Sequence, residues 1–262
     1  MRSLITLSTL LSLLLLSPLH AQDLATTCHA TSSYDVTLAP GSLLFDRPSP
    51  EPTRVEIQRD HLRTDGNAVT LTPAQQDRVS LFEHDLRALA PRVRKVAQNG
   101  VDMAAQALQT EVAGLGLSVA THAEFDRRLA THATELKQRI ERSQSTHDWD
   151  GDAMQQFVDQ VSADLMPLVG ADLGQQAINA AMSGDLQTAA RLRDRAGSLV
   201  TGLKPRLEQS MQALRPQVDA LCPAIQRLAR LQQGLRDNKG RLLSLLQAGS
   251  DQTGISAPAG SD

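Results

Sequence analysis

The sequence predicts a mainly α-helical protein in which a small N-terminal antiparallel β-meander precedes long antiparallel helical hairpins. From Tyr34 to Leu71 apolar residues alternate with polar ones, which is the period of a strand with one buried face. From Thr72 onward they recur every three or four residues, which is the period of an amphipathic helix. Aromatic residues make up only 2% of the 262-residue chain, which argues against an aromatic-rich β-barrel.

Residues 1–21 have the order of a secretory signal peptide. Arg2 is followed by an apolar run from Leu4 to Leu16, and the small residue Ala21 closes the segment. This run is shorter than the roughly 20 residues that a membrane-spanning helix needs. We therefore expect cleavage after Ala21 and an exported mature chain without a transmembrane segment.

Residues 22–71 are expected to form the β-meander. Pairs of apolar residues separated by one polar residue indicate short strands, namely Val36 and Leu38, Leu43 and Phe45, Val55 and Ile57, and Val69 and Leu71. The segment from Arg47 to Thr53 contains three prolines, so it is expected to be a loop. Asp65-Gly66-Asn67 tolerates positive φ angles and predicts a tight hairpin turn.

Residues 72–248 are expected to form the helical-hairpin bundle. Thr72-Pro73-Ala74-Gln75 combines an N-cap, a first-turn proline and a capping-box glutamine, so a helix is expected to begin here. Its apolar seam is interrupted by Pro91, where we expect a kink, and it ends near Gly114 and Gly116. The seam consists of Val79, Phe82, Leu86, Leu89, Val93, Val96, Met103, Leu108, Val112 and Leu115.

Further helices are indicated by a second capping box at Thr121-His122-Ala123-Glu124 and by Asp152 with Gln155. The longest seam runs from Leu203 to Leu228 and contains three prolines, so bent segments are expected rather than one rod. Residues 249–262 are rich in Gly, Ser, Pro and Asp and are expected to be a disordered tail.

Charge and motifs exclude several classes of function. The formal net charge of -3 lacks the basic excess that nucleic-acid binding requires, so no nucleic-acid partner is expected. The chain contains no nucleophile elbow, no H-E-x-x-H helix, no phosphate-binding glycine loop and no dinucleotide fingerprint. We therefore expect no enzyme activity, no catalytic residues and no cofactor.

Three polar groups in the helical region have alternative interpretations. Asp148, Asp150 and Asp152 resemble the start of a calcium loop, but the glycine and glutamate of that loop are missing at its sixth and twelfth positions. An interhelical turn is the main interpretation and a weak divalent-cation site is the alternative.

His132 shares the spacing of the apolar seam, which favours an interface histidine over a metal ligand. The cluster Arg92, Arg94 and Lys95 is expected to form surface salt bridges, with attraction to anionic lipid or an acidic partner as the alternative.

Two cysteines, Cys28 and Cys222, lie in the exported part of the chain. An even number of thiols in an oxidising compartment favours a disulfide. Two buried free thiols are the alternative, and metal binding is weaker because no further Cys or His has ligand spacing apart from the adjacent His29.

The sequence resembles a known family. The resemblance rests on the signal peptide, Cys28, the segment from Asp65 to Thr72, the helix opening Pro73-Ala74-Gln75-Gln76, the segment Leu86 to Pro91, and Cys222. These features resemble the YggN-type family of proteobacterial periplasmic proteins, catalogued as domain of unknown function 2884, over about residues 25–245. The resemblance implies a periplasmic Gram-negative setting and a disulfide between Cys28 and Cys222, and it supplies no activity.

Two functions are compatible with these observations. The first is a non-enzymatic periplasmic module that binds another protein or an envelope component through the faces of its helical hairpins. The second is a carrier of an apolar or lipid-like small molecule between hairpins. The sequence names neither the partner nor an oligomeric state.

Overall fold

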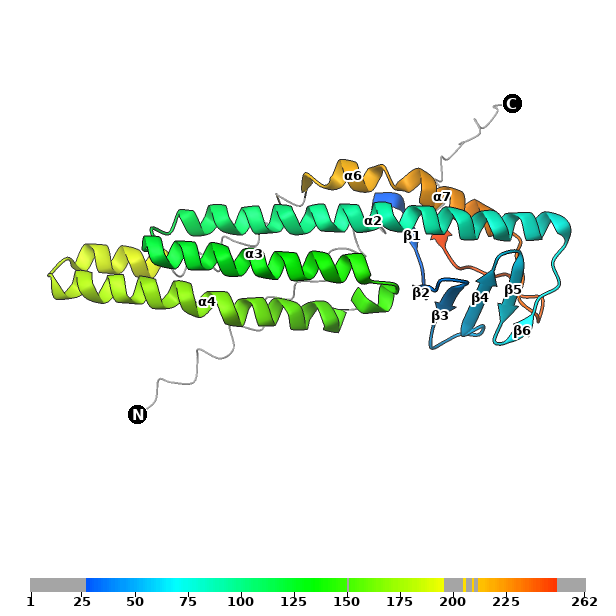
Figure 1. Cartoon of the computed structure of the whole chain (residues 1–262), viewed down its shortest axis with the longest axis horizontal. Coiled ribbons are helices and arrows are strands. Elements are labelled where there is room, and N and C mark those ends of the chain that lie inside the picture. Colours follow the sequence, from blue (N-terminus) through cyan, green and yellow to red (C-terminus); the bar gives the residue numbers. More distant parts are fainter. Residues whose placement is uncertain (1–26, 150, 196–204, 206–208, 210–211, 249–262) are drawn as a thin grey trace, which may run out of the picture.

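The computed structural model describes residues 27–149, 151–195, 205, 209 and 212–248. The expected signal peptide and C-terminal tail lie outside these residues. The molecule is elongated, with a sheet at one end and paired helices at the other (Figure 1). We call residues 28–99 and 215–248 the head and residues 100–195 the arm.

The head contains the antiparallel meander that the sequence predicts, with five strands in chain order. Asp65 and Gly66 form the expected tight turn, with φ angles of 47° and 80°. The last strand is shorter than predicted, because Val69 and Leu71 follow it and pack against the core outside the sheet. The strands are β2 (Asp35–Leu38), β3 (Leu43–Asp46), β4 (Arg54–Gln58), β5 (His61–Thr64) and β6 (Asn67–Ala68).

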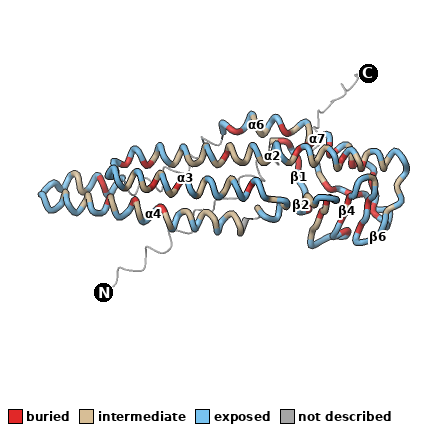
Figure 2. The backbone as a smooth tube through the Cα atoms, viewed as in Figure 1, coloured by how far each residue is buried: buried red, intermediate tan, exposed pale blue. Residues whose placement is uncertain are grey.

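One face of the sheet is buried against helix α2, and buried residues of α7 (Cys222–Leu231), which packs on α2, belong to the same core. Phe82 of α2 lies 6.0 Å from Phe45 of β3, measured between ring centroids. Buried residues line this sheet face and the facing sides of the helices (Figure 2). The head core includes Leu43, Phe45, Val55, Ile57, Leu62, Val79, Phe82, Leu228, Leu235 and Leu245.

The C-terminal segment, residues 232–248, differs from the expected helical bundle. It leaves α7 and returns to the head, where β7 (Gln247–Ala248) pairs with β1 (Ala30–Thr31). Leu243 and Leu245 are buried with the period of an extended chain, and Gly234 and Gly240 supply turns with positive φ. The ends of the described chain are therefore joined in one small sheet.

Helix α2 (Pro73–Ala113) runs from the head into the arm (Figure 1). The predicted capping box is present, with Thr72 accepting from the Gln75 backbone and Gln75 accepting from the Thr72 backbone. The helix continues through Pro91 and ends at Gly114. One helix therefore contributes Phe82 and Leu89 to the head core and Val112 to the arm core.

The arm contains α2, α3 (Val119–Arg142) and α4 (Gly151–Met182), and residues 186–195 are also helical. The prediction that α3 begins with a Thr121 capping box is wrong. The N-cap is Ser118, whose hydroxyl accepts from the Thr121 backbone N–H, so Thr121 lies in the first turn. The arm core consists mainly of Val112, Leu115, Phe125, Leu129, Leu165, Val169, Leu173 and Leu192.

The last predicted seam falls partly outside the described residues, and its end forms two short helices. These are α6 (Arg215–Asp219) and α7, and each has a proline in its first turn, Pro216 and Pro223. The expected bent segments are therefore present in this part of the seam.

Polar contacts between α2 and the α6–α7 segment recur every seven residues along α2. Arg78 donates to the Gln233 carbonyl at 2.6 Å, and Asp85 pairs with Arg227 at 2.7 Å. Seven and fourteen residues after Asp85, Arg92 donates to the Ala220 carbonyl and Asn99 to the Gln217 side chain. This spacing is that of two antiparallel helical segments packed side by side.

The outer edge of the sheet is covered by the α3–α4 connection. The Leu38 backbone N–H donates to the Gln144 carbonyl at 2.7 Å, and Thr37 forms a bridge with Ser145. An exposed edge strand would be open to pairing with other chains, and this loop occupies part of it. The same contacts connect the head to the arm.

Candidate functional site

The disulfide joins the two predicted cysteines. Cys28 precedes β1 and is 2% exposed, and Cys222 is the first residue of α7. Their Cα atoms are 5.0 Å apart and 194 positions apart in sequence. Cys28 is buried in the same core as Leu221 and Ile225, so this bond connects the N-terminal and C-terminal segments of the head. A disulfide of this kind is typical of proteins outside the cytoplasm.

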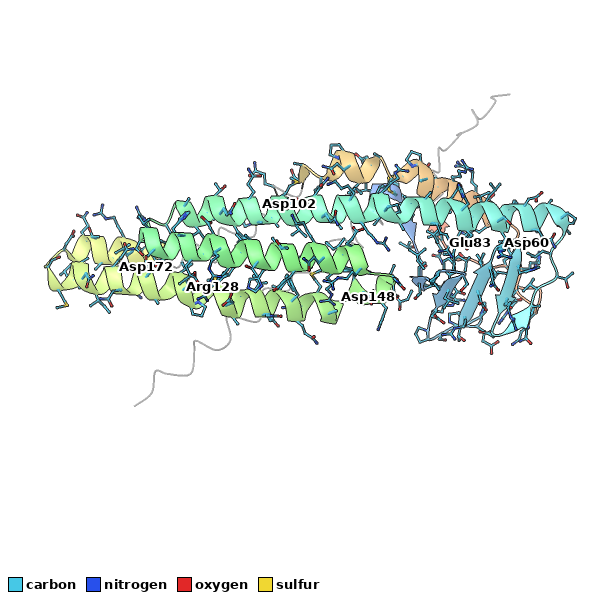
Figure 3. All side chains as sticks on the ribbon, in the orientation of Figure 1. Asp60, Glu83, Asp102, Arg128, Asp148 and Asp172 are labelled. Carbon is cyan, nitrogen blue, oxygen red and sulfur yellow. A yellow bond between two sulfur atoms is a disulfide. The ribbon has the colours of Figure 1, made fainter. Side chains whose placement is uncertain are left out.

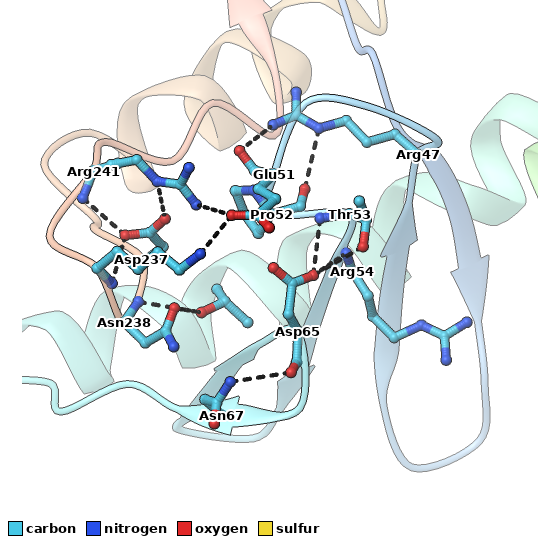
Figure 4. A network of polar contacts seen from close by, with 12 residues as sticks. Arg47, Glu51, Pro52, Thr53, Arg54, Asp65, Asn67, Asp237, Asn238 and Arg241 are labelled. Atoms are coloured by element: carbon cyan, nitrogen blue, oxygen red, sulfur yellow. Dashed lines mark hydrogen bonds and ion pairs between the residues drawn. The ribbon is translucent and has the colours of Figure 1, made fainter.

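A polar cleft of about 530 Å³ lies beside the proline-rich β3–β4 loop (Figure 4). The C-terminal segment forms its other wall, where Lys239 donates to Glu51 at 2.5 Å. Asp65 accepts from the backbone and hydroxyl of Thr53 and from the Arg54 backbone. The cleft is lined by Asp46, Arg47, Glu51, Thr53, Arg54, Asp65, Asn67, Asn238 and Lys239.

Hydrogen bonds lower the pKa of three carboxylates in and beside this cleft, those of Glu51, Asp65 and Asp237. The hydrogen bond from Lys239 lowers the pKa of Glu51, and the bond from the Arg54 backbone lowers the pKa of Asp65. Burial alone would raise the pKa of Asp237, but hydrogen bonds from Arg241 and the Lys239 backbone outweigh it and lower this pKa. The cleft therefore offers charged and polar groups that can bind a ligand, and the lowered pKa values of Glu51 and Asp65 do not suit a general acid near neutral pH.

Charged side chains also connect α3 to α4 in the arm, where Arg128 is labelled in Figure 3. Arg128 contacts Glu124 at 2.6 Å and Asp164 at 2.7 Å. His132 lies 2.9 Å from Asp164 through Nε2 and packs edge-on against the Phe157 ring. His132 is therefore an interface histidine, as its spacing predicts.

We expect acid to weaken the arm through Glu124. Hydrogen bonds from Arg127 and Arg128 lower the pKa of Glu124 from 4.5 to about 2. A carboxyl with a lowered folded-state pKa stabilises the fold above its unfolded pKa, and this contribution is lost as the pH falls through the folded value. From about pH 5 to about pH 2, the thermal midpoint should fall further in the parent than in Glu124→Gln.

The control for this measurement is Asp77→Asn, which changes an exposed carboxyl on α2 outside these networks. Its thermal midpoint should follow the parent over the whole interval. A Glu124→Gln curve parallel to the parent curve would show that the ion pairs contribute no stability.

The end of the arm exposes large apolar side chains. Ile178 is 55% exposed and Met182 82% exposed, and they lie four residues apart on one face of α4. Leu186, beyond the Gly184 turn, is 71% exposed. We call Ile178, Met182 and Leu186 the arm tip.

Of the three aspartates that resemble the start of a calcium loop, the structure describes the side chain of Asp148. Asp148 accepts at one carboxylate oxygen from the Ser143 hydroxyl and from the backbone N–H groups of Gln144 and Ser145. This is the role of a turn residue. Asp150 and the side chain of Asp152 lie outside the described residues. In the described part of the chain no group of His, Cys, Asp or Glu has the arrangement of a metal site.

The predicted basic cluster makes different contacts from those expected. Arg92 donates to the Ala220 carbonyl at the end of α6, and Arg94 donates to the Ser143 carbonyl at the end of α3. Guanidinium groups at these positions satisfy carbonyls at the negative ends of helices. These two arginines therefore bind backbone carbonyls in the structure, where surface salt bridges were predicted.

The polar cleft was missed in the sequence. Its walls come from residues 46–67 and 238–239, which the fold brings together when the C-terminal segment returns to the head. The only local sequence signal is the proline-rich loop with its neighbouring Asp65-Gly66 turn, which marks one wall and gives no indication of the other.

The fold and these surfaces define an α+β protein with a disulfide-bonded head and a helical arm. Within the described residues, no helix combines the length and apolar character needed to span a bilayer. The family model described as protein of unknown function (DUF2884) matches residues 28–244, and the chain belongs to this family. No curated protein and no solved structure matches the chain.

Proposed function

We propose that this protein is a non-enzymatic periplasmic binding module whose arm carries the contact surface for a partner protein. The observation that carries the proposal is the arm tip, where Met182 and Leu186 are exposed at the end of the molecule opposite the head (Figure 1). Grouped exposed apolar side chains mark interaction surfaces in proteins that otherwise keep such residues inside.

Other features support binding over catalysis and over small-molecule transport. Glu51 and Asp65 in the cleft have lowered pKa values and hydrogen-bonded partners, whereas a general acid at neutral pH needs a raised pKa. The cleft is lined by charged side chains, which suit polar ligands better than a lipid-like cargo. The disulfide and the sequence of residues 1–21 support an exported, periplasmic location.

The test is site-specific photo-cross-linking in the native cell with a photoreactive residue at Met182. Gln58, exposed on β4 in the head, is the matched control position. We expect a discrete cross-linked species from position 182 and none of that mass from position 58. The same products from both positions, or none from position 182, would contradict the proposal.

A second measurement distinguishes the surface from the fold. Met182→Ser with Leu186→Ser should abolish the adduct formed from a photoreactive residue at Ile178. The thermal midpoint should stay at the parent value, because both side chains are exposed. Lipid co-purifying with the parent in stoichiometric amount would favour the carrier function instead.

A further inference from the structure

A basic face runs along the side of α2 that contacts the α7 segment. On α2, positions 78, 81, 85, 88, 92 and 95 recur every three or four residues and so share one side of the helix. This side faces α7, as the contacts of Arg78 with Gln233 and of Asp85 with Arg227 show. We call Arg78, Arg92, Lys95, Arg227 and Arg230 the basic face.

Arg230 belongs to this face by its position on α7. It lies three residues after Arg227, which reaches Asp85, and three before Gln233, whose carbonyl accepts from Arg78. Its guanidinium is exposed. The face therefore extends from position 78 to position 95 of α2, about 25 Å at the rise of an α-helix.

Few carboxylates offset these cations. Asp85 is the one acid between them, and Asp219 lies at the edge, where α6 ends. Arg78 and Arg92 use part of their donors on backbone carbonyls, so their positive charge is not cancelled by an ion pair. Residues 215–241 as a whole hold six Lys and Arg against two Asp.

The net charge differs between the two ends of the molecule. Residues 100–195 of the arm contain 14 Asp and Glu against eight Lys and Arg. An anionic surface would attract the basic face and repel the arm, so the charge pattern orients the molecule with its arm away from that surface.

We propose that the basic face docks the protein on the anionic phospholipid headgroups of a membrane surface. Guanidinium groups bind phosphate with several donors, and a row of them about 25 Å long matches an extended array of phosphates. Leu81, 43% exposed, lies on the same side of α2 between Arg78 and Asp85, and an apolar side chain among cations is typical of helices that lie on bilayers. This docking is independent of any partner at the arm tip.

The experiment is co-sedimentation of the purified mature chain with vesicles of zwitterionic phospholipid, alone or with about a third anionic phospholipid. We expect binding to the anionic vesicles only, and its loss in high salt. The double variant Lys95→Gln with Arg230→Gln should bind about 25-fold more weakly, at about fivefold for each cation near the surface. Neither side chain makes a described contact, so this variant should keep the parent thermal midpoint.

The matched control is Arg142→Gln with Arg193→Gln, which removes the same charge from the arm and should leave vesicle binding within about twofold of the parent. Equal losses in the two double variants would overturn the proposal, because net charge alone would then explain the binding. Binding to zwitterionic vesicles with the same affinity would overturn it too. Retention on polyglutamate without binding to anionic vesicles would assign the face to an acidic protein instead.

Discussion

Replacing both cysteines, Cys28→Ala with Cys222→Ala, is expected to lower the free energy of unfolding by about 5 kcal/mol. The bond joins residues 194 positions apart, so it removes a large conformational entropy from the unfolded chain. A loss of this size is comparable with the whole stability of many domains. Urea unfolding of parent and variant, followed by circular dichroism, measures it.

The control for this prediction is the reductant. Dithiothreitol should lower the urea midpoint of the parent to that of the double variant and leave the variant unchanged. A parent midpoint that is the same with and without reductant would show that the disulfide does not stabilise the fold.

Phe82→Ala is expected to cost about 3–5 kcal/mol of unfolding free energy. Phe82 is fully buried in the head core, which holds residues of the sheet and of α7, and its ring packs against that of Phe45. Truncation to alanine removes this apolar contact and leaves a cavity that the rigid sheet cannot fill. Equilibrium urea unfolding gives the difference directly.

Leu81→Ala is the matched control because Leu81 is the neighbouring apolar residue of the same helix and is 43% exposed. Its cost should be about 0.5 kcal/mol or less. Similar costs at the two positions would contradict the assignment of Phe82 to the core between sheet and helix.

Local patterns predicted the parts of this fold that depend on neighbouring residues. The Thr72 capping box and the Asp65-Gly66 turn are determined by hydrogen bonds and φ angles within four residues, and both are present. The start of α3 was placed three residues late because Ser118 and Thr121 are both acceptable caps. The choice depends on contacts beyond the local sequence, since the Ser118 backbone donates to Asp172 of α4.

Long-range pairing was the part that periodicity could not predict. Residues 232–248 follow a long helical seam, and only their packing on the sheet shows that Leu243 and Leu245 belong to an extended segment. The polar cleft depends on this return, because Lys239 reaches Glu51 across 188 residues of sequence. The disulfide could be predicted, since the chain has only two cysteines.

The joining of the two chain ends also determines when the head can form. A ribosome makes the sheet first, and α7, Cys222 and β7 last. Until these final residues emerge, Phe45 and Ile57 lack the α7 side of their core, and Cys28 has no thiol to pair with. The head can therefore be completed only after nearly the whole chain has been synthesised.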